Sequence, residues 1–142
     1  MKIETINVSL KKDLELFSYP IFVGNNLLTR PDNLLNKYIK NKKIIIIHDS
    51  FFSSKLVLDE TFKEFVKSIK EITLSVNLIA IPGGDQTKNM IELTNIIEKA
   101  LSYEIDRECL IIAFGGGVIG DIAGFAASIL LRGIKFINVP TT

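Results

Sequence analysis

Short apolar runs alternate with longer amphipathic stretches along most of this chain. Runs with the length of strands lie at 42–47, 74–81, 109–114 and 134–139. The four consecutive isoleucines in the first run are typical of a strand covered on both faces, as in a parallel sheet. Helices are predicted between the strands, because apolar residues recur at helical spacing within 51–69 and 90–101, and 122–131 is apolar, small and free of proline. This alternation predicts an α/β domain with a mainly parallel sheet.

The N-terminal part of the chain has a different pattern. Residues 2–10 alternate between polar and apolar, and 14–23 forms a second candidate strand, so together they predict a β-hairpin. We expect a turn at 24–26, and then a helix over 27–39 that is interrupted at Pro31.

Composition and charge narrow the class of protein. The 142 residues suffice for one modest domain, and 47% hydrophobic with 23% charged residues is typical of a soluble globular protein. A formal net charge of +1 gives no electrostatic reason to expect nucleic acid or an anionic membrane as a partner. Glycines and Asp121 break the most apolar stretch, 109–131, and the N-terminus lacks the apolar core of a signal peptide. A cytoplasmic location is therefore the default expectation.

The chain has one cysteine and one histidine. Cys109 lies in an apolar run, which predicts a buried structural thiol rather than a nucleophile. His48 has too few companions to build a metal site, since zinc sites draw on several His, Cys or carboxylate ligands. We therefore expect no metal centre made by these residues.

Candidate chemistry is concentrated in the glycine-rich segment 115–120. Gly115, Gly117 and Gly120 satisfy the pattern G-x-G-x-x-G between a predicted strand and a predicted helix. Glycines let the backbone approach an anion closely, and the positive end of a helix favours phosphate, although the same glycines could simply form a tight turn. Asp121 suits a helix start but would repel a nearby phosphate, so we expect it to face a hydroxyl, an amide or water.

Polar residues also follow the other predicted strands. Asp49 comes after the isoleucines, Asp85 and Lys88 follow the next strand, and residues 141–142 follow the last one. The carboxyl ends of parallel strands meet at one edge of a sheet, where α/β proteins bind ligands. The sequence therefore predicts a ligand cleft at this edge.

Five segments, taken in order, resemble the 3-dehydroquinate synthase family. The main signature consists of 115–127, 131–134 and 139–142, and the segments 19–24 and 82–88 support it. The resemblance implies a Rossmann-like NAD-binding domain over residues 1–142 with an N-terminal hairpin, without the family's α-helical C-terminal domain. Because the chain stops directly after a predicted core strand, we expect it to be a fragment of a longer two-domain enzyme.

The resemblance also implies an activity. Enzymes of this family are phosphate-eliminating lyases of the shikimate pathway, which leads to chorismate and the aromatic amino acids. They convert 3-deoxy-arabino-heptulosonate 7-phosphate to 3-dehydroquinate and phosphate, and their NAD takes a hydride from the substrate and later returns it. A divalent metal, zinc or cobalt, is held by a glutamate and two histidines of the C-terminal domain, so its ligands are outside this chain. We expect the family's homodimer for the complete enzyme and no catalysis by this chain alone.

Most of the cofactor contacts that the resemblance implies fall on the strand ends. Asp49 would accept hydrogen bonds from the adenosine ribose and would disfavour the extra phosphate of NADP. Segment 82–88 would complete the adenosine side, and Asp85 stands where the family usually has glutamate. The residues implied there are Gly83, Gly84, Asp85, Gln86 and Lys88.

The glycine-rich segment and the chain's last residues complete the implied site. Asp121 would lie near the nicotinamide end of NAD, and Arg132 would reach a substrate phosphate across a dimer interface, for which arginine is well suited. The remaining residues would hold the pyrophosphate or contact the nucleotide: Gly115, Gly116, Gly117, Val118, Ile119, Gly120, Thr141 and Thr142.

Structural and functional alternatives remain open at this point. Asp49 could cap the following helix, Lys88 could be a solvated helix residue, and Arg132 could be a cation at a helix C-terminus. The protein could also be another sugar-phosphate cyclase, a glycerol-dehydrogenase-like oxidoreductase or a non-catalytic nucleotide-binding module.

Overall fold

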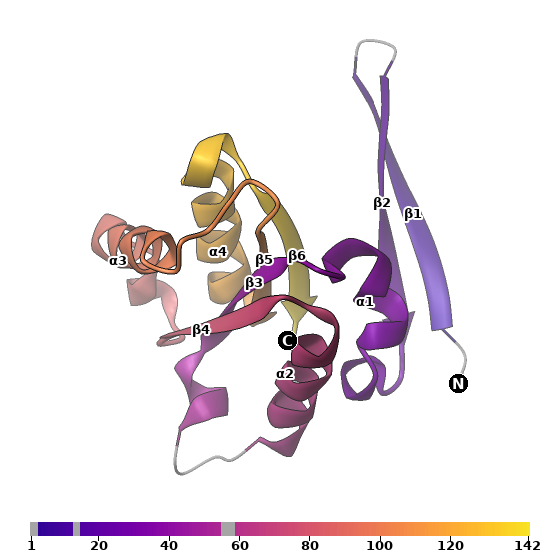
Figure 1. Cartoon of the computed structure of the whole chain (residues 1–142), viewed down its shortest axis with the longest axis horizontal. Coiled ribbons are helices and arrows are strands. Elements are labelled where there is room, and N and C mark those ends of the chain that lie inside the picture. Colours follow the sequence, from indigo (N-terminus) through magenta and orange to yellow (C-terminus); the bar gives the residue numbers. More distant parts are fainter. Residues whose placement is uncertain (1–2, 13–14, 55–58) are drawn as a thin grey trace.

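A parallel four-stranded sheet forms the centre of the computed structural model, which describes residues 3–12, 15–54 and 59–142 (Figure 1). Its strands lie in the order β4-β3-β5-β6, and all three neighbouring pairs are parallel. Their bounds are Lys43–Asp49 for β3, Ser75–Ile81 for β4, Leu110–Gly115 for β5 and Lys135–Pro140 for β6. The predicted α/β class with a mainly parallel sheet is confirmed.

Helices cover both faces of this sheet (Figure 1). On one face, Ile44 and Ile46 of β3 pack in a core with helices α1 (Asp32–Ile39) and α2 (Glu60–Ile72). On the other face, Ile45 and Ile47 pack in a core with α3 (Met90–Leu101) and α4 (Gly117–Ile129). Successive residues of a strand point to opposite faces, so the row of isoleucines supplies both cores at once.

The N-terminal hairpin is a separate two-stranded sheet. Strand β1 (Ile3–Lys12) pairs antiparallel with β2 (Glu15–Gly24), and Ile6 lies opposite Ile21. The hairpin extends away from the main sheet beside α1 (Figure 1), and its Tyr19, Ile21 and Val23 side chains are exposed. The predicted hairpin is confirmed, although residues 2 and 13–14 of the predicted segment lie outside the described residues.

Two predicted helices begin elsewhere than expected. The helix expected at 122–131 begins at Gly117, because the glycine-rich segment itself forms its first turn. In place of one helix over 51–69, a 3₁₀ turn covers Ser50–Ser53 and α2 begins at Glu60, while residues 55–58 lie outside the described residues. Asp59 caps α2 by accepting a hydrogen bond from the Phe62 amide, and such a cap favours a new helix start there.

Because the strands are parallel, their carboxyl ends lie at one edge of the sheet, and the connections that leave β3 and β5 diverge there. From β3 the chain passes through α2 to β4, and it then returns through α3 past β3 to β5. The connections that leave β3 and β5 therefore turn to opposite faces of the sheet. In open α/β sheets, ligands bind at the point where neighbouring connections diverge in this way.

The two residues that the sequence excluded from chemistry are both buried. Cys109 is 0% exposed, and burial raises the pKa of its thiol to about 11, so the unreactive protonated form prevails at neutral pH. His48 is 1% exposed, its Nδ1 lies 2.9 Å from the Asp49 carbonyl oxygen, and its ring packs against Phe62. Burial lowers the pKa of His48 below its usual value, so the imidazole is neutral at pH 7 and donates to that carbonyl.

Within the described residues, no helix is both long enough and apolar enough to cross a membrane.

The pKa of His48 predicts how stability depends on pH. The unfolded chain binds a proton near pH 6.5 while the folded chain resists it, so the free energy of unfolding should fall as pH drops from 7 to 5. One proton changes this free energy by at most about 1.4 kcal/mol per pH unit. Urea denaturation at several pH values measures the slope, and His48→Gln, which keeps a donor for the Asp49 carbonyl, should flatten it. If the unfolding free energy of the unsubstituted chain and of His48→Gln depends equally on pH between 7 and 5, His48 is not the group responsible.

Candidate functional site

The glycine-rich segment forms the turn from β5 into α4. Gly115 is the last residue of β5, Gly116 is the N-cap and Gly117 is the first residue of a 13-residue helix. The Gly120 amide already donates to the Gly116 carbonyl at 3.1 Å, which closes the first turn. The earlier amides of a helix have no partner within it, and here they face the carboxyl edge of the sheet with the positive end of the helix dipole.

The glycines of this turn differ in what a side chain would meet. A Cβ on Gly115 would lie 2.5 Å from Cγ1 of the buried Ile119, and one on Gly116 would lie 3.3 Å from Oγ1 of Thr142. A Cβ on Gly117 would have no atom within 4 Å apart from its chain neighbours and the nearby backbone of its own helix. Packing against the buried Ile119 therefore accounts for Gly115, whereas the Gly116 contact is with an exposed side chain. Gly117 has lower helix propensity than alanine and leaves open space beside the helix start.

The end of β6 lies directly beside this turn. The Thr141 amide donates to the Gly115 carbonyl at 2.9 Å, and the contact between Gly116 and Thr142 follows from this pairing. Both threonines are exposed. The structure thus brings 141–142 to the glycine turn, as the convergence of strand ends predicted.

Asp49 lies at the neighbouring strand end, where it performs the structural role that was left open. Its Oδ1 accepts a hydrogen bond from the Phe51 amide at 2.9 Å and so caps the turn Ser50–Ser53. The other oxygen approaches Gly83 so closely that a Cβ there would overlap it. A carboxylate offers about four acceptor positions, so the cap leaves capacity for a ligand hydroxyl.

In loop 82–88 the backbone conformation requires a glycine at position 84. Gly84 has φ of 102°, a conformation that L side chains rarely adopt, and the Gln86 side chain lies against it. Asp85 begins a short 3₁₀ turn, Asp85–Thr87, and is exposed together with Gln86. Gly83 therefore lies beside Asp49 at the ends of β4 and β3, and Gly84, Asp85 and Gln86 follow it in the same loop.

Lys88 and Asp121 form an ion pair across the site. Lys88 Nζ lies 2.7 Å from Asp121 Oδ2, and this hydrogen bond raises the pKa of the lysine. Both side chains are well exposed, so the pair adds little to stability. The sequence interpretation assigned these residues to opposite ends of NAD, whereas the structure places their charged groups side by side. Asp121 also stands in the second turn of α4 rather than at its start.

Arg132 lies at the far end of the same helix. It follows α4 in a short turn, Leu130–Arg132, and α4 spans about 20 Å at 1.5 Å per residue. Leu131 and Arg132 have φ values of 51° and 75°, which are unfavourable for residues other than glycine. Gly133, with φ of 99°, ends this turn as predicted. Arg132 therefore cannot reach the glycine turn of its own chain.

Sequence reasoning missed a group of aromatic residues beneath the site. Phe52 packs edge-on against Phe114, the residue just before the glycine turn, and Phe62 contacts both rings. Four of the chain's phenylalanines lie within 51–65, so their number near Asp49 was a visible signal. Periodicity assigned them to one helix and thereby concealed that 51 and 52 belong to a separate turn.

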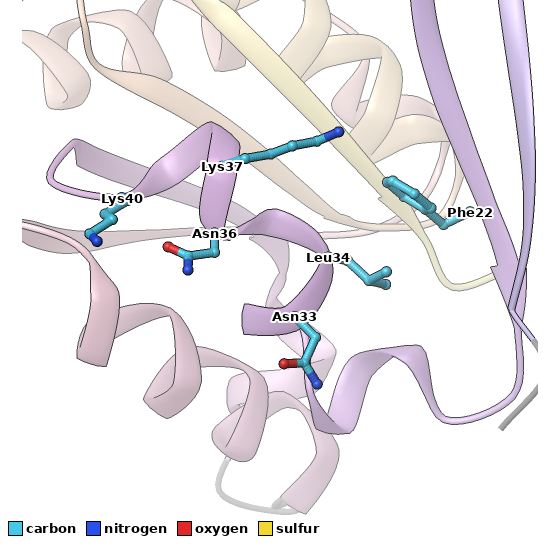
Figure 2. Close-up of a pocket in the computed structure, with 6 residues that line it drawn as sticks. All are labelled: Phe22, Asn33, Leu34, Asn36, Lys37 and Lys40. Carbon is cyan, nitrogen blue, oxygen red and sulfur yellow. The ribbon is translucent and has the colours of Figure 1, made fainter.

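A groove of about 540 Å³ lies elsewhere, between β2 and α1 (Figure 2). Phe22 and Leu34 form its apolar part, and Figure 2 shows that Lys37 extends toward β2 whereas Lys40 points away from it. Its other lining residues are Asn33 and Asn36, so none of the candidate site residues contributes to it. Among the described residues, no group of three or more His, Cys, Asp or Glu side chains is arranged to hold a metal ion.

Comparison with known proteins shows which proteins this chain resembles. Residues 78–142 match the family model described as 3-dehydroquinate synthase N-terminal. The chain is 40% identical over 130 residues to the chloroplastic 3-dehydroquinate synthase of Solanum lycopersicum, which covers 92% of this chain and 28% of that protein. It thus spans about a third of the length of the curated relatives it matches.

Solved structures of sugar-phosphate cyclases have the same fold. A crystal structure of 2-deoxy-scyllo-inosose synthase aligns with a TM-score of 0.73 and 25% identity, over 96% of this chain and 36% of that one. A second structure of that enzyme, complexed with carbaglucose-6-phosphate, NAD⁺ and Co²⁺, aligns with a TM-score of 0.70 and 26% identity, over 96% and 35% of the two chains. The Rossmann-like fold class is therefore confirmed. The chain matches 3-dehydroquinate synthases along nearly its whole length, and residues 78–142 match the model of their N-terminal part, as the sequence signature predicted.

Proposed function

We propose that this chain is the NAD-binding half of a 3-dehydroquinate synthase in the shikimate pathway, acting in the cytoplasm. The complete enzyme would convert 3-deoxy-arabino-heptulosonate 7-phosphate to 3-dehydroquinate and phosphate. Residues 1–142 would be the N-terminal domain of this two-domain enzyme. The identity to 3-dehydroquinate synthases and the geometry of the glycine turn support this proposal together.

The open space at Gly117 is the observation that carries the proposal. Glycine has lower helix propensity than alanine, and no atom of another part of the chain requires it here. A pyrophosphate at this position would need the close backbone approach that only glycine allows. The amides of Gly117, Val118 and Ile119 would then serve as its donors, with Gly120 allowing α4 to pack closely on Asn138.

The neighbouring strand ends would hold the two nucleosides. Asp49 would accept hydrogen bonds from the adenosine ribose, with segment 83–86 beside it, and its negative charge would disfavour NADP. Thr141 and Thr142 would contact the nucleotide next to the glycine turn. Because Lys88 and Asp121 lie side by side, we propose that they serve neighbouring groups of the ligand near its nicotinamide end.

Arg132 would contribute to the site of a second copy of the chain and not to the site on its own chain. Its distance from the glycine turn and its strained backbone favour a role at a second copy, where its guanidinium would bind a substrate phosphate. The proposal therefore includes a homodimer for the complete enzyme. The strain, about 1 kcal/mol for each of Leu131 and Arg132, would be retained because it directs the side chain outward.

NAD, when bound, would supply the oxidation that makes phosphate elimination possible and the hydride that is later returned. The residues of this chain would bind and orient it. The divalent metal that the family implies would require ligands other than His48, whose ring is buried and bonded to the Asp49 carbonyl.

Another sugar-phosphate cyclase is the second candidate, since the solved neighbours include two structures of 2-deoxy-scyllo-inosose synthase. The higher identity to 3-dehydroquinate synthases favours the first candidate. The complete gene product should release phosphate from 3-deoxy-arabino-heptulosonate 7-phosphate if the first candidate is right. Release only from the sugar phosphate of another cyclase would favour the second.

The glycine turn predicts a specific effect on NAD binding. Gly117→Ala should weaken NAD binding by about tenfold or more, because its methyl group would occupy the space proposed for the pyrophosphate, while the free energy of unfolding should not fall. Isothermal titration with millimolar NAD measures the affinity, and urea denaturation measures the stability.

Gly124→Ala is the matched control, since it lies in the same helix and its Cβ would make an ordinary contact with the Phe136 ring at 3.6 Å. It should bind NAD as the unsubstituted chain does. If Gly117→Ala binds NAD equally well, the turn is merely structural.

We also expect the 142-residue chain to catalyse no formation of 3-dehydroquinate in the presence of NAD and zinc or cobalt. The reason is that its single histidine is buried and cannot supply the metal ligands that the family requires. Phosphate release from 3-deoxy-arabino-heptulosonate 7-phosphate is the assay. The product of the complete reading frame serves as the positive control, and measurable turnover by the chain alone would refute this expectation.

A further inference from the structure

Phe51 is a large apolar side chain left exposed beside the candidate site. It lies two residues after β3, and 56% of its surface is accessible. The roles proposed above do not use it. Single exposed apolar side chains are common on protein surfaces, so what distinguishes this ring is its place at the candidate ligand-binding edge.

Its position is fixed by its neighbours on two sides. The Phe51 amide donates to Asp49 Oδ1 at 2.9 Å, so the Phe51 backbone is held next to the carboxylate that is proposed to bind the ribose. Its ring meets Phe52 edge-on, with centroids 5.6 Å apart and an interplanar angle of 83°. Phe52 in turn packs edge-on against the buried Phe114. The exposed ring is therefore the outermost member of a packed aromatic series and not a loose surface side chain.

The surroundings of Phe51 match the adenine end of the proposed ligand. The turn that contains it contacts both β3 and β4, and the adjoining Asp49 carboxylate lies against Gly83. If the pyrophosphate lies at Gly117 and a ribose at Asp49, the base attached to that ribose extends past β3 toward this turn. A purine has two flat faces and needs a flat partner more than a hydrogen-bonding one.

We propose that the Phe51 ring is the platform on which the adenine of the bound nucleotide stacks. This inference rests on the proposed function, because it assumes that the ribose binds at Asp49. The ring would bind the base through its face without reading its edge, so other purine nucleotides would be accepted in the same place. Asp49 would fix the ribose, and the ring two residues later would fix the base.

The test compares two halves of the dinucleotide on the full 142-residue chain. AMP and nicotinamide mononucleotide are titrated separately, and NMR follows the affinity and the adenine H2 and H8 resonances. Phe51→Ala should weaken AMP binding by about tenfold, in line with the loss of one base–aromatic stack, and leave the nicotinamide mononucleotide unchanged. The upfield shift of the adenine protons caused by the ring should disappear as well.

Two further variants make the outcome decisive. Phe51→Trp should restore AMP binding, and Phe125→Ala, which removes a comparably exposed ring (53%) on α4, should have no effect. Unchanged AMP affinity in Phe51→Ala, with NAD binding retained, would overturn this inference and leave the proposed function standing. A chain that binds neither nucleotide would refute the proposed function itself. A changed sedimentation coefficient with unchanged affinity would show instead that the ring is a protein contact.

Discussion

Strands β3 and β5 are packed on both faces, by α1 and α2 on one side and by α3 and α4 on the other. Residues Ile44–Ile47 are at most 1% exposed, so neither face can be given up to solvent without losing a large part of the core. Parallel strands need crossover connections, and two covered faces require that these connections use both sides. The gap between diverging connections at the carboxyl edge follows from this requirement, and the candidate site occupies that gap.

Within the site, the glycines separate into those that packing needs and one that it does not. Gly115 makes room for Ile119, and Gly83 makes room for the Asp49 carboxylate, so each would be a glycine even in a protein without a ligand. Gly117 has no such neighbour. The distinction turns a weak motif into a specific argument, because the cost of a glycine without a structural reason points to something outside the protein.

The sequence was sufficient for the class of fold and for the elements that contribute to the site. Long runs such as 42–47 and 109–114 are unambiguous, and strand ends in a parallel sheet must converge. The start of α4 was missed by five residues because glycines have low helix propensity, yet the helix begins at Gly117, where the Gly120 amide bonds to the Gly116 carbonyl and Ile119 is buried. The contact between Lys88 and Asp121 joins residues 33 positions apart, and local pattern contains no information about such a pair.

Asp49 shows why alternatives had to stay open at the level of sequence. The capping role and the ligand role use the same carboxylate, and the structure shows the first without excluding the second. Phe51 was hidden for a related reason, since its spacing fits the helical period of the residues that follow. Asp49 caps the 3₁₀ turn and Asp59 caps α2, so these two residues separate the turn from the helix. Such caps act over only two or three residues, which helical spacing does not reveal.

The separate hairpin has a consequence for how the molecule opens. Strands β1 and β2 pair with each other in a sheet of their own, and the half-buried Phe22 lines the groove that β2 shares with α1. An isolated pair of strands is marginally stable in water. Its amide hydrogens should therefore exchange with solvent through local fraying at a low free-energy cost, whereas those of β3 and β5 should exchange only when the whole domain unfolds. We therefore expect the hairpin to open at a lower free-energy cost than the central sheet.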